Sequence, residues 1–354
     1  MNILKYICLP GLLVSGDIQT VSAVESKTDK NPNILVILID DAGYNDFGFM
    51  GSKEMQTPNI DALTSEGVVF TDAHVAATVS SPSRACLITG RYGHRFGYEC
   101  NLSDRTNGLP LEEETIAEVF KTNGYRTAAI GKWHLGSRDE QHPNNRGFDL
   151  FYGMKAGGRD YFYNEKKSDR PGDERNLLLN DRQVKFEKYL TDAFSEKAVE
   201  FINESSQPFM MYLAYNAVHT PMQATDEDMA KFEGHPRQKL AAMTYALDRG
   251  VGTVIRGLKD SGKFDNTLIF FLSDNGGATT NQSSNYPLKG FKGNKFEGGH
   301  RVPYFVVWKN GIPAGKPYDG LVSSLDIFAT AIDAASISKT RNRLDGVSLL
   351  PYLK

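Results

Sequence analysis

The sequence predicts an α/β fold in which a mostly parallel sheet is covered by helices. Short apolar runs alternate along the chain with segments of helical period, which is the pattern of buried parallel strands joined by crossover helices. The 354 residues are enough for one large domain or two ordinary ones. Apolar and charged fractions of 40% and 23% are those of a folded globular protein, not of a disordered chain.

The sequence predicts five strands and five helices. The predicted strands are Asn33–Ile39, Arg126–Ile130, Phe209–Tyr215, Thr267–Leu272 and Pro303–Trp308. The predicted helices are Thr57–Glu66, Leu111–Thr122, Thr191–Asn203, Gln238–Lys259 and Ser324–Ala334. In the second helix, Glu112, Glu113 and Glu114 fall in the first turn, as the helix dipole favours, and Asn123-Gly124 ends it. Residues 137–188 are polar and without sustained period, which predicts surface loops and short elements.

Charge and cysteine content narrow the classes of partner. A net charge of −3 without a block of like charges argues against a nucleic-acid surface. The three cysteines, Cys8, Cys86 and Cys100, lack metal-ligand spacing, and a bridge between Cys86 and Cys100 is left open.

Residues 1–23 have the pattern of a secretory signal. Lys5 precedes an apolar stretch from Tyr6 to Val14, and Val21-Ser22-Ala23 offers a small-residue cleavage site after Ala23. Pro10 and Gly11 interrupt the apolar stretch, so a cytoplasmic leader without structure is the alternative. The pattern predicts export, and no later stretch reaches the ~20 apolar residues of a membrane span.

Polar residues follow four of the five predicted strands at the point where each strand ends. They are Asp40-Asp41, Gly131-Lys132-Trp133-His134, His219-Thr220-Pro221 and Ser273-Asp274-Asn275-Gly276-Gly277. In open α/β sheets, ligands bind outside the carboxyl ends of the strands. These side chains are therefore predicted to line one crevice.

Two acidic pairs at this edge predict a cation site. Asp40-Asp41 alone is equally typical of a turn or a helix cap. A second pair, Asp274-Asn275, after another strand would crowd carboxylates together, which is costly unless a cation is bound. Oxygen ligands favour Ca²⁺ or Mg²⁺ over zinc, and the spacing does not separate those two ions.

Cationic side chains near the same motifs predict an anionic ester as ligand. They are Lys132 and the cluster Lys289, Lys292 and Arg301. Lys292 lies within a glycine-rich run, 290–299, that is predicted as a loop over the site. Ordinary solvated lysines are the alternative. His134 and His219 are either structural histidines or members of the site.

The segment from Ser80 to Arg91 contains a candidate nucleophile. Pro82 suits a first helical turn, so Ser80 is predicted just before a helix N-terminus, where backbone N–H groups and the dipole favour an anion. The hydroxyl would then meet a bound phosphate or sulfate. A plain N-cap serine is the alternative.

This segment, S-S-P-S-R-A-C-L-I-T-G-R, resembles the signature of the formylglycine-dependent type I sulfatase family, in which a Cys or Ser before x-Pro-Ser-Arg becomes formylglycine. Other motifs occur in that family's order and approximate spacing, from about Asn33 to Leu350: D-D-A-G-Y-N-D, G-K-W-H-L-G, H-T-P, S-D-N-G and L-K-G-F-K-G-N-K-F-E-G-G-H-R-V-P. The resemblance implies an alkaline-phosphatase-like fold, with a mixed sheet sandwiched between helices, and a sulfuric ester hydrolase domain over residues 31–354.

The resemblance also implies one bound calcium ion. Its ligands would be Asp40, Asp41, Asp274, Asn275 and the modified Ser80. Calcium and the lysines would stabilise charge that otherwise repels the nucleophile.

Catalytic roles follow from the same resemblance. Arg84 would hold the formylglycine hydrate, and Lys132 and Lys292 would neutralise the sulfate oxygens. His134 resembles the base that collapses the sulfated intermediate, and His219, with Lys292, the group that protonates or stabilises the leaving alcohol. A gem-diol suits these roles, because one hydroxyl attacks sulfur and deprotonation of the second expels sulfate.

The sequence departs from the usual family pattern at two points, and each leads to a further prediction. Serine at position 80 requires a serine-type sulfatase-maturing enzyme, which in this family occurs in some bacteria and often serves exported enzymes. We therefore predict a bacterial periplasmic or extracellular location. The chain stops at Lys354, near the point where the family's large domain hands over to a smaller C-terminal subdomain, so that subdomain is expected to be missing or truncated.

A sulfated sugar from a glycan is the predicted substrate. The polar segment with Arg159 and Asp160 suits hydroxyl groups and sugar faces, while a lipid pocket would be mostly apolar. His300 is a predicted further contact, and a solvated loop far from the site is the alternative. Two other functions remain: a phosphate or phosphonate monoester hydrolase that uses Ser80 directly, and a catalytically silent glycan-binding relative.

Overall fold

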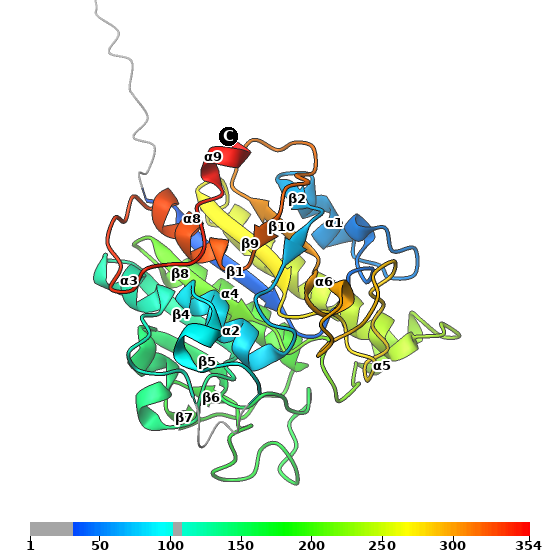
Figure 1. The fold of residues 1–354 in the computed structure, drawn as a ribbon. Coiled ribbons are helices and arrows are strands. Elements are labelled where there is room, and N and C mark those ends of the chain that lie inside the picture. The colour runs from blue at the N-terminus through cyan, green and yellow to red at the C-terminus, as the bar shows by residue number, and fades with distance from the viewer. Residues whose placement is uncertain (1–30, 102–107) are drawn as a thin grey trace, which may run out of the picture. The chain divides into compact units, whose positions relative to one another are not determined.

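The computed structural model describes residues 31–101 and 108–354 (Figure 1). The predicted signal segment, 1–23, lies outside the described residues. The main sheet has nine strands in the order β2-β10-β9-β1-β8-β4-β5-β6-β7. They are β1 Asn33–Ile39, β2 Val68–Phe70, β4 Arg126–Lys132, β5 Leu150–Met154, β6 Leu178–Leu179, β7 Arg182–Gln183, β8 Phe209–Ala214, β9 Thr267–Ser273 and β10 Tyr304–Val307.

The centre of this sheet is parallel and its margins are antiparallel. β9, β1, β8, β4 and β5 run parallel to one another. β10 pairs antiparallel with β9 and β2, and β6 pairs antiparallel with β5 and β7. A second sheet joins β3 (Ala73–His74) and β11 (Val322–Ser323) in parallel. The predicted class, a mostly parallel mixed sheet, is confirmed.

Helices cover both faces of the main sheet. They are α1 Pro58–Thr64, α2 Ser80–Thr89, α3 Ile116–Thr122, α4 Leu190–Glu204, α5 Asp226–Ala230, α6 Gln238–Asp260, α7 Glu297–His300, α8 Asp326–Ala334 and α9 Leu350–Leu353, with short 3₁₀ turns η1 Gly48–Met50, η2 Gly93–Phe96, η3 Asp139–Gln141 and η4 Pro143–Arg146. Within the described residues, none of the helices has the length and apolar character needed to cross a membrane.

Strand β1 shows how the core is divided. Leu35, Ile37 and Ile39 belong to one cluster with residues of α4 and α6, while the alternate residues, such as Val36, join a second cluster with α2, α3 and α8. Figure 1 shows these two groups of helices on opposite faces. Because β1 is buried on both sides, its sequence is a continuous apolar run and not an alternation.

Several predicted boundaries are wrong. The helix predicted from Leu111 begins at Ile116, because Thr115 and Glu118 form a capping box there, so the acidic run 112–114 precedes the helix. Strand β5, inside the segment predicted as loops and short elements, is a main-sheet strand paired with β4. Ser80 is the first residue of α2, and Val79 takes the cap position. Cys86 and Cys100 carry free thiols.

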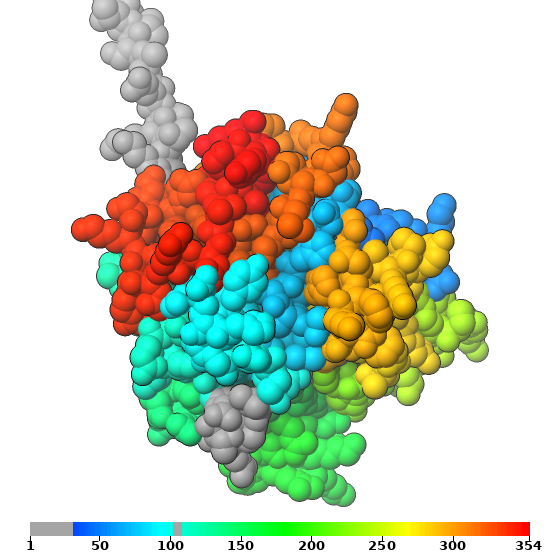
Figure 2. Space-filling view, viewed as in Figure 1, coloured from blue at the N-terminus to red at the C-terminus, as the bar shows by residue number. Residues whose placement is uncertain are grey.

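Two connections meet beside α2. The segment that precedes this helix receives a backbone hydrogen bond from the glycine-rich loop, Gly293 N to Thr78 O at 2.8 Å. In the space-filling view, the blue segment before α2 lies beside the gold and orange segment that leads to α7 (Figure 2). The loop predicted over the site is confirmed as a mostly irregular segment that ends in the single turn of α7.

Candidate active site

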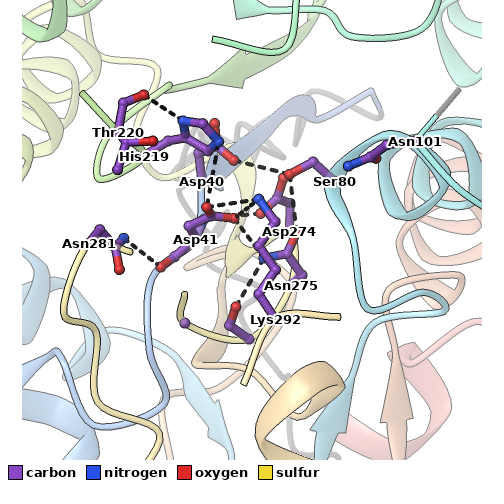
Figure 3. Close-up of polar contacts among 12 residues, drawn as sticks. Asp40, Asp41, Ser80, Asn101, His219, Thr220, Asp274, Asn275, Asn281 and Lys292 are labelled. Atoms are coloured by element: carbon purple, nitrogen blue, oxygen red, sulfur yellow. Dashed lines mark hydrogen bonds and ion pairs between the residues drawn. The ribbon is translucent and has the colours of Figure 1, made fainter. Parts of the chain in front are cut away.

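Strands β9, β1, β8 and β4 are neighbours in the sheet, and their carboxyl ends lie side by side. Figure 3 shows that the predicted polar residues after β1, β8 and β9 lie close together: Asp40, Asp41, His219, Asp274 and Asn275. Lys132 Nζ lies 2.7 Å from Asp40 Oδ2. The backbone N–H of Asp41 donates to Asp274 Oδ1 at 3.2 Å. Residues more than two hundred positions apart in the sequence thus share one centre, because parallel neighbours end at the same edge.

Ser80 lies with its hydroxyl between two of the predicted metal ligands. Its Oγ is 3.2 Å from Asp40 Oδ1 and 3.1 Å from Asn275 Oδ1. The amide of Asn275 donates through Nδ2 to Asp41 Oδ1 at 2.8 Å, which turns its oxygen toward Ser80. Oxygens that share one Ca²⁺ at about 2.3–2.6 Å lie roughly 3 Å apart. The donor set therefore fits a hard cation.

Three cationic side chains face the three carboxylates of this centre. Lys132 pairs with Asp40, as above, and Lys292 Nζ lies 2.7 Å from Asp41 Oδ1. Arg84 donates to Asp274 Oδ2 through Nε at 3.0 Å and Nη2 at 2.8 Å. The Arg84 and Asp274 side chains are fully buried. Charge in the centre is therefore balanced by side chains alone.

Burial and pairing oppose each other in setting the pKa values here. Burial alone would raise the pKa of Asp40, but the charges of Lys132, His219 and Arg84 outweigh it and hold that pKa below its ordinary value. Burial lowers the pKa of Lys132 despite its pairing with Asp40. For Lys292, the attraction of Asp41, Asp40 and Asp274 outweighs burial and raises the pKa. The centre is a place where ionisation depends on specific neighbours.

His134 follows Lys132 by two residues, and one nitrogen of its ring has no hydrogen-bond partner among the described residues. This nitrogen, Nδ1, is buried. Burial, with the charges of Lys132 and Arg84, lowers the pKa of His134 well below its ordinary value. Ser81 Oγ donates to the His134 carbonyl at 2.7 Å, which ties the histidine to the start of α2. A Cβ at Gly157 would lie 2.5 Å from Nε2, so only glycine lets that loop cover the ring.

His219 is oriented by its own backbone. Nδ1 lies 2.6 Å from the Thr220 carbonyl, which can only accept, so Nδ1 carries the proton. Nε2 then faces Asp41 Oδ2 at 3.6 Å. The buried hydroxyl of Tyr161 donates a hydrogen bond to the His219 carbonyl at 2.8 Å, which fixes the backbone of this loop. One nitrogen and two carboxylates, from His219, Asp40 and Asp41, bring ligand atoms within 4.8 Å of one another.

Asn281 belongs to the site although no motif indicated it. Its Nδ2 donates to the carbonyl of Asp41 at 3.1 Å (Figure 3) and to that of Val218 at 2.9 Å. Ser283 Oγ donates to the same Asp41 carbonyl at 3.0 Å. Asp41 has a φ of 61°, a conformation that needs such support in a residue other than glycine. The available signal was a polar loop directly after the Asp274-Asn275 motif.

Arg159 and Asp160 were predicted as substrate contacts, but both side chains make hydrogen bonds inside the protein. Arg159 Nη2 donates to both carboxylate oxygens of Asp169, at 2.7 and 2.9 Å, and its other nitrogens donate to backbone carbonyls. The side chain is fully buried, so it has no surface to offer a sugar. Asp160 accepts from Ser168 at 2.7 Å and Gln223 at 2.9 Å. A buried guanidinium needs a carboxylate partner, which explains this internal arrangement.

The remaining predicted residues lie on the glycine-rich loop and its end. Lys289 lies over the ring of Phe296, 4.3 Å from its centroid, rather than at the carboxylates. Arg301 donates to the Thr71 carbonyl. His300 lies near Glu297, with Nε2 3.9 Å from Oε1. Of the predicted cationic cluster, Lys292 is the member brought to the carboxylates.

Comparison with known proteins gives consistent results. The model of the Sulfatase family matches residues 32–337. The chain is 35% identical to the uncharacterized sulfatase YdeN of Escherichia coli (strain K12), covering 93% of this chain and 67% of that protein. It is 32% identical to human N-acetylgalactosamine-6-sulfatase, covering 91% and 66%. The chain thus spans about two thirds of the length of these relatives.

A solved structure is closer in sequence. The crystal structure of Ps i-CgsB in complex with k-i-k-neocarrahexaose superposes with a TM-score of 0.85 at 44% identity. The superposition covers 91% of this chain and 76% of that chain.

Proposed function

The chain belongs to the sulfatase family of sulfuric ester hydrolases, with an alkaline-phosphatase-like fold, and on this premise we propose that it hydrolyses sulfate esters of sugars derived from glycans. The position of Ser80 carries the proposal. Its hydroxyl lies between Asp40 and Asn275 at the start of α2, where a helix N-terminus favours an anion.

In this proposal Ser80 is oxidised to formylglycine by a serine-type sulfatase-maturing enzyme, which removes two hydrogens as the CH₂OH group becomes an aldehyde. The hydrated aldehyde supplies one hydroxyl for attack on sulfur and a second whose deprotonation releases sulfate. Arg84 Nη2 lies 3.5 Å from Asp40 Oδ1, the same oxygen that Ser80 contacts, so the guanidinium is within reach of the modified side chain.

We further propose that the oxygens around Ser80 hold one calcium ion. The ligands would come from Asp40, Asp41, Asp274, Asn275 and residue 80. Since Lys132, Lys292 and Arg84 already balance the three carboxylates, a bound dication supplies net positive charge that attracts an anionic ester and stabilises its transition state.

The two histidines are proposed to move the protons. The lowered pKa of His134 keeps its ring neutral at neutral pH, as a general base requires. His219 presents Nε2 to the centre, since Nδ1 is held by the Thr220 carbonyl, so this nitrogen would serve the leaving alcohol together with Lys292. Lys132 and Lys292 would contact the sulfate oxygens.

Relatives and loops favour a sugar as the alcohol. One relative is named N-acetylgalactosamine-6-sulfatase, and the crystal structure of Ps i-CgsB is that of a complex with k-i-k-neocarrahexaose. A Cβ at Gly158 would lie 3.3 Å from the His219 ring, so the polar segment around Asp160 reaches the centre through its backbone. His300, at the end of α7, which follows the loop that carries Lys292, remains the proposed side-chain contact. A bacterial periplasmic or extracellular location fits a glycan substrate.

Mass spectrometry of the Ser80 peptide from active protein tests the proposal. We expect the loss of two hydrogens, and Ser80→Ala should be inactive. Activity should be compared on 2-, 3-, 4- and 6-sulfated monosaccharides, a sulfated steroid, and phosphate and phosphonate monoesters. Unmodified serine in a protein that prefers phosphorus esters would support the other hydrolase. Unmodified serine in a protein that binds sulfated glycans and turns over none of these esters would support a silent glycan-binding relative or failed maturation.

A further inference from the structure

A second cluster of potential metal ligands lies outside the calcium site. His74 Nε2 is 3.1 Å from Glu297 Oε2, and His300 Nε2 is 3.9 Å from Glu297 Oε1. Ligand atoms of the three residues all lie within 4.8 Å of one another. The two imidazole rings are 5.1 Å apart between centroids. All three side chains are partly exposed, so an ion can reach them from solvent.

The backbone fixes this cluster in place. The N–H of Val75 donates to the His300 carbonyl at 2.8 Å, and the N–H of Val302 donates to the Ala73 carbonyl at 2.9 Å. His74 and Arg301 form an antiparallel bridge between these two bonds. Glu297 and His300 lie at the two ends of one helical turn, α7, three residues apart, so their side chains share a face. The positions of the donors thus do not depend on flexible loops.

The donor types differ from those of the calcium site. Two imidazoles and one carboxylate are a ligand set typical of zinc, with bonds of about 2.0–2.2 Å that place neighbouring ligand atoms roughly 3.3 Å apart in a tetrahedron. The distances of 3.1 and 3.9 Å lie on either side of this value. Asp72 Oδ1 is 3.8 Å from His74 Nδ1, beyond hydrogen-bond distance, so this carboxylate adds negative charge beside the ring.

Arg301 is the group that opposes a cation here. Its Nη1 lies 3.4 Å from Glu297 Oε2 and 3.5 Å from Asp72 Oδ1. The other nitrogens of the guanidinium donate to the Thr71 carbonyl, so Arg301 keeps partners when Glu297 turns to an ion. Glu297 Oε1, on the His300 side, is not shared with Arg301.

We propose that His74, Glu297 and His300 bind one divalent transition ion of the zinc type. The site joins two segments that build the catalytic centre. His74 precedes the connection to Ser80, and α7 follows the loop that carries Lys292 and contacts Gly276, whose N–H donates to the Gly299 carbonyl at 2.9 Å. A bound ion stabilises the folded state by mass action and holds these segments together.

Calorimetric titration with Zn²⁺ tests this site without substrate, so its outcome is independent of the proposed function. The protein is saturated with Ca²⁺ first, which occupies the oxygen-rich centre. Cys8 and Cys100 are replaced by serine, because an exposed thiol such as Cys100 would capture zinc on its own. We expect one Zn²⁺ per chain and a higher Tm in its presence. Co²⁺ at the same site should give the absorption of a tetrahedral N/O complex.

His74→Ala, His300→Ala and Glu297→Gln should each weaken Zn²⁺ binding by at least ~10-fold, the smallest loss typical even of an outer-shell partner. His94→Ala, at an exposed histidine, is the matched control and should bind as the parent does. Each variant should melt like the parent without zinc. Absence of Zn²⁺ binding in the parent, or unchanged binding in all three ligand variants, would overturn the proposal.

Discussion

Two buried ion pairs in this protein have nearly the same local geometry and different surroundings. Arg84, in α2, lies 2.8 Å from Asp274, which follows β9, and Arg159 and Asp169 lie 2.7 Å apart in the polar segment 137–188. All four side chains are fully buried. Burial and pairing alone therefore do not distinguish the proposed catalytic pair from a structural one.

Their neighbours do distinguish them. Around Asp274 are further carboxylates, and Asp41 donates its own backbone N–H to that residue. Asp169 also accepts from the backbone N–H of Asn164 at 2.7 Å, and Arg159 also donates to the backbone carbonyls of Asp160 and Arg175. The first pair sits in a group of charges that a cation would complete, while the second closes on itself. Further charged groups of both signs beside the pair, rather than burial of the pair, indicate the proposed catalytic site.

The largest expected effect separates these two pairs directly. Asp274→Ala should abolish activity and remove the stabilisation by calcium, because Asp274 is a proposed ligand. Asp40→Ala should do the same. Asp169→Ala should retain activity per folded molecule. Both Asp274→Ala and Asp169→Ala remove the carboxylate that accepts two hydrogen bonds from a buried guanidinium, so each should lower the free energy of unfolding by about 3–5 kcal/mol.

Denaturant unfolding in calcium and in chelator, with turnover of a sulfated sugar, measures these effects. Asp274→Ala should lose more stability in calcium than in chelator, and Asp169→Ala should lose the same amount in both. Equal Tm values of the parent protein with and without calcium would contradict the structural part of the calcium proposal. Full activity of Asp274→Ala would contradict its catalytic part.

A smaller effect is expected at two buried asparagines that hold the same two regions. Asn281→Ala removes the donor that supports the Asp41 carbonyl, and we expect a loss of ~10–100-fold in calcium affinity or kcat, as for other residues that orient metal ligands. Asn176→Ala removes a donor to the Arg170 carbonyl in the polar segment and should affect stability alone. Titration calorimetry with Ca²⁺ compares the two. An Asn281→Ala protein with the parent's calcium affinity and kcat would argue against the positioning role.

A third comparison uses two histidines whose pKa values are lowered by burial, His134 in the centre and His142 in the polar segment. A lowered pKa in the folded state means that the unfolded state takes up the proton first as pH falls below the ordinary value of about 6.5. Stability is then complete above that pH and falls below it, by at most ~1.4 kcal/mol per pH unit for each group.

The pH dependence of activity should distinguish His134 from His142. Because neutral His134 is the proposed base, the acid limb of the kcat/KM profile, which reports the free enzyme, should lie below pH 6.5 and disappear with the activity in His134→Asn. His142→Asn should flatten the fall in stability at low pH while leaving the kcat/KM profile unchanged. Measurement of both profiles between pH 4 and 8 tests this, and an acid limb that shifts only in His142→Asn would reverse the assignment.

Features that depend on the local sequence could be predicted, and features that depend on contacts between distant residues could not. Strand β1 was predicted with its observed ends because a strand buried on both faces is apolar throughout. Strand β5 was missed as a member of the main sheet because it is short, is set in polar sequence and contains Gly153, which the approach of Gly131 O requires. The capping box at Thr115 outweighed the acidic run that was predicted as a first turn.

The same distinction between local sequence and distant contacts applies to the residues of the candidate site. Residues in motifs after strands, such as Asp40 and Asp274, come together because the sheet brings strand ends together. Asn281 was missed because its role depends on the φ of a residue far away in sequence, which no local pattern encodes. Arg159 was predicted at the substrate from its polar neighbours, yet a partner ten residues later, Asp169, buries it. Side-chain direction in irregular segments is set by such tertiary pairs.

The smallest expected effect concerns the substrate contact itself and compares Arg159→Ala with His300→Ala. His300 is partly exposed at the end of α7, which follows the loop that carries Lys292. Its loss should raise KM for a sulfated monosaccharide a few-fold, the range of one hydrogen bond at ~0.5–1.5 kcal/mol, with kcat nearly unchanged. Arg159→Ala should lower stability and leave KM and kcat of the folded fraction unchanged, because the guanidinium is buried. Steady-state kinetics in zinc-free, calcium-containing buffer separate these from effects of the second metal site. Unchanged KM in His300→Ala would remove that residue from the substrate site and leave the sugar proposal standing, whereas faster turnover of a sulfated steroid than of every sulfated sugar would reject the sugar proposal.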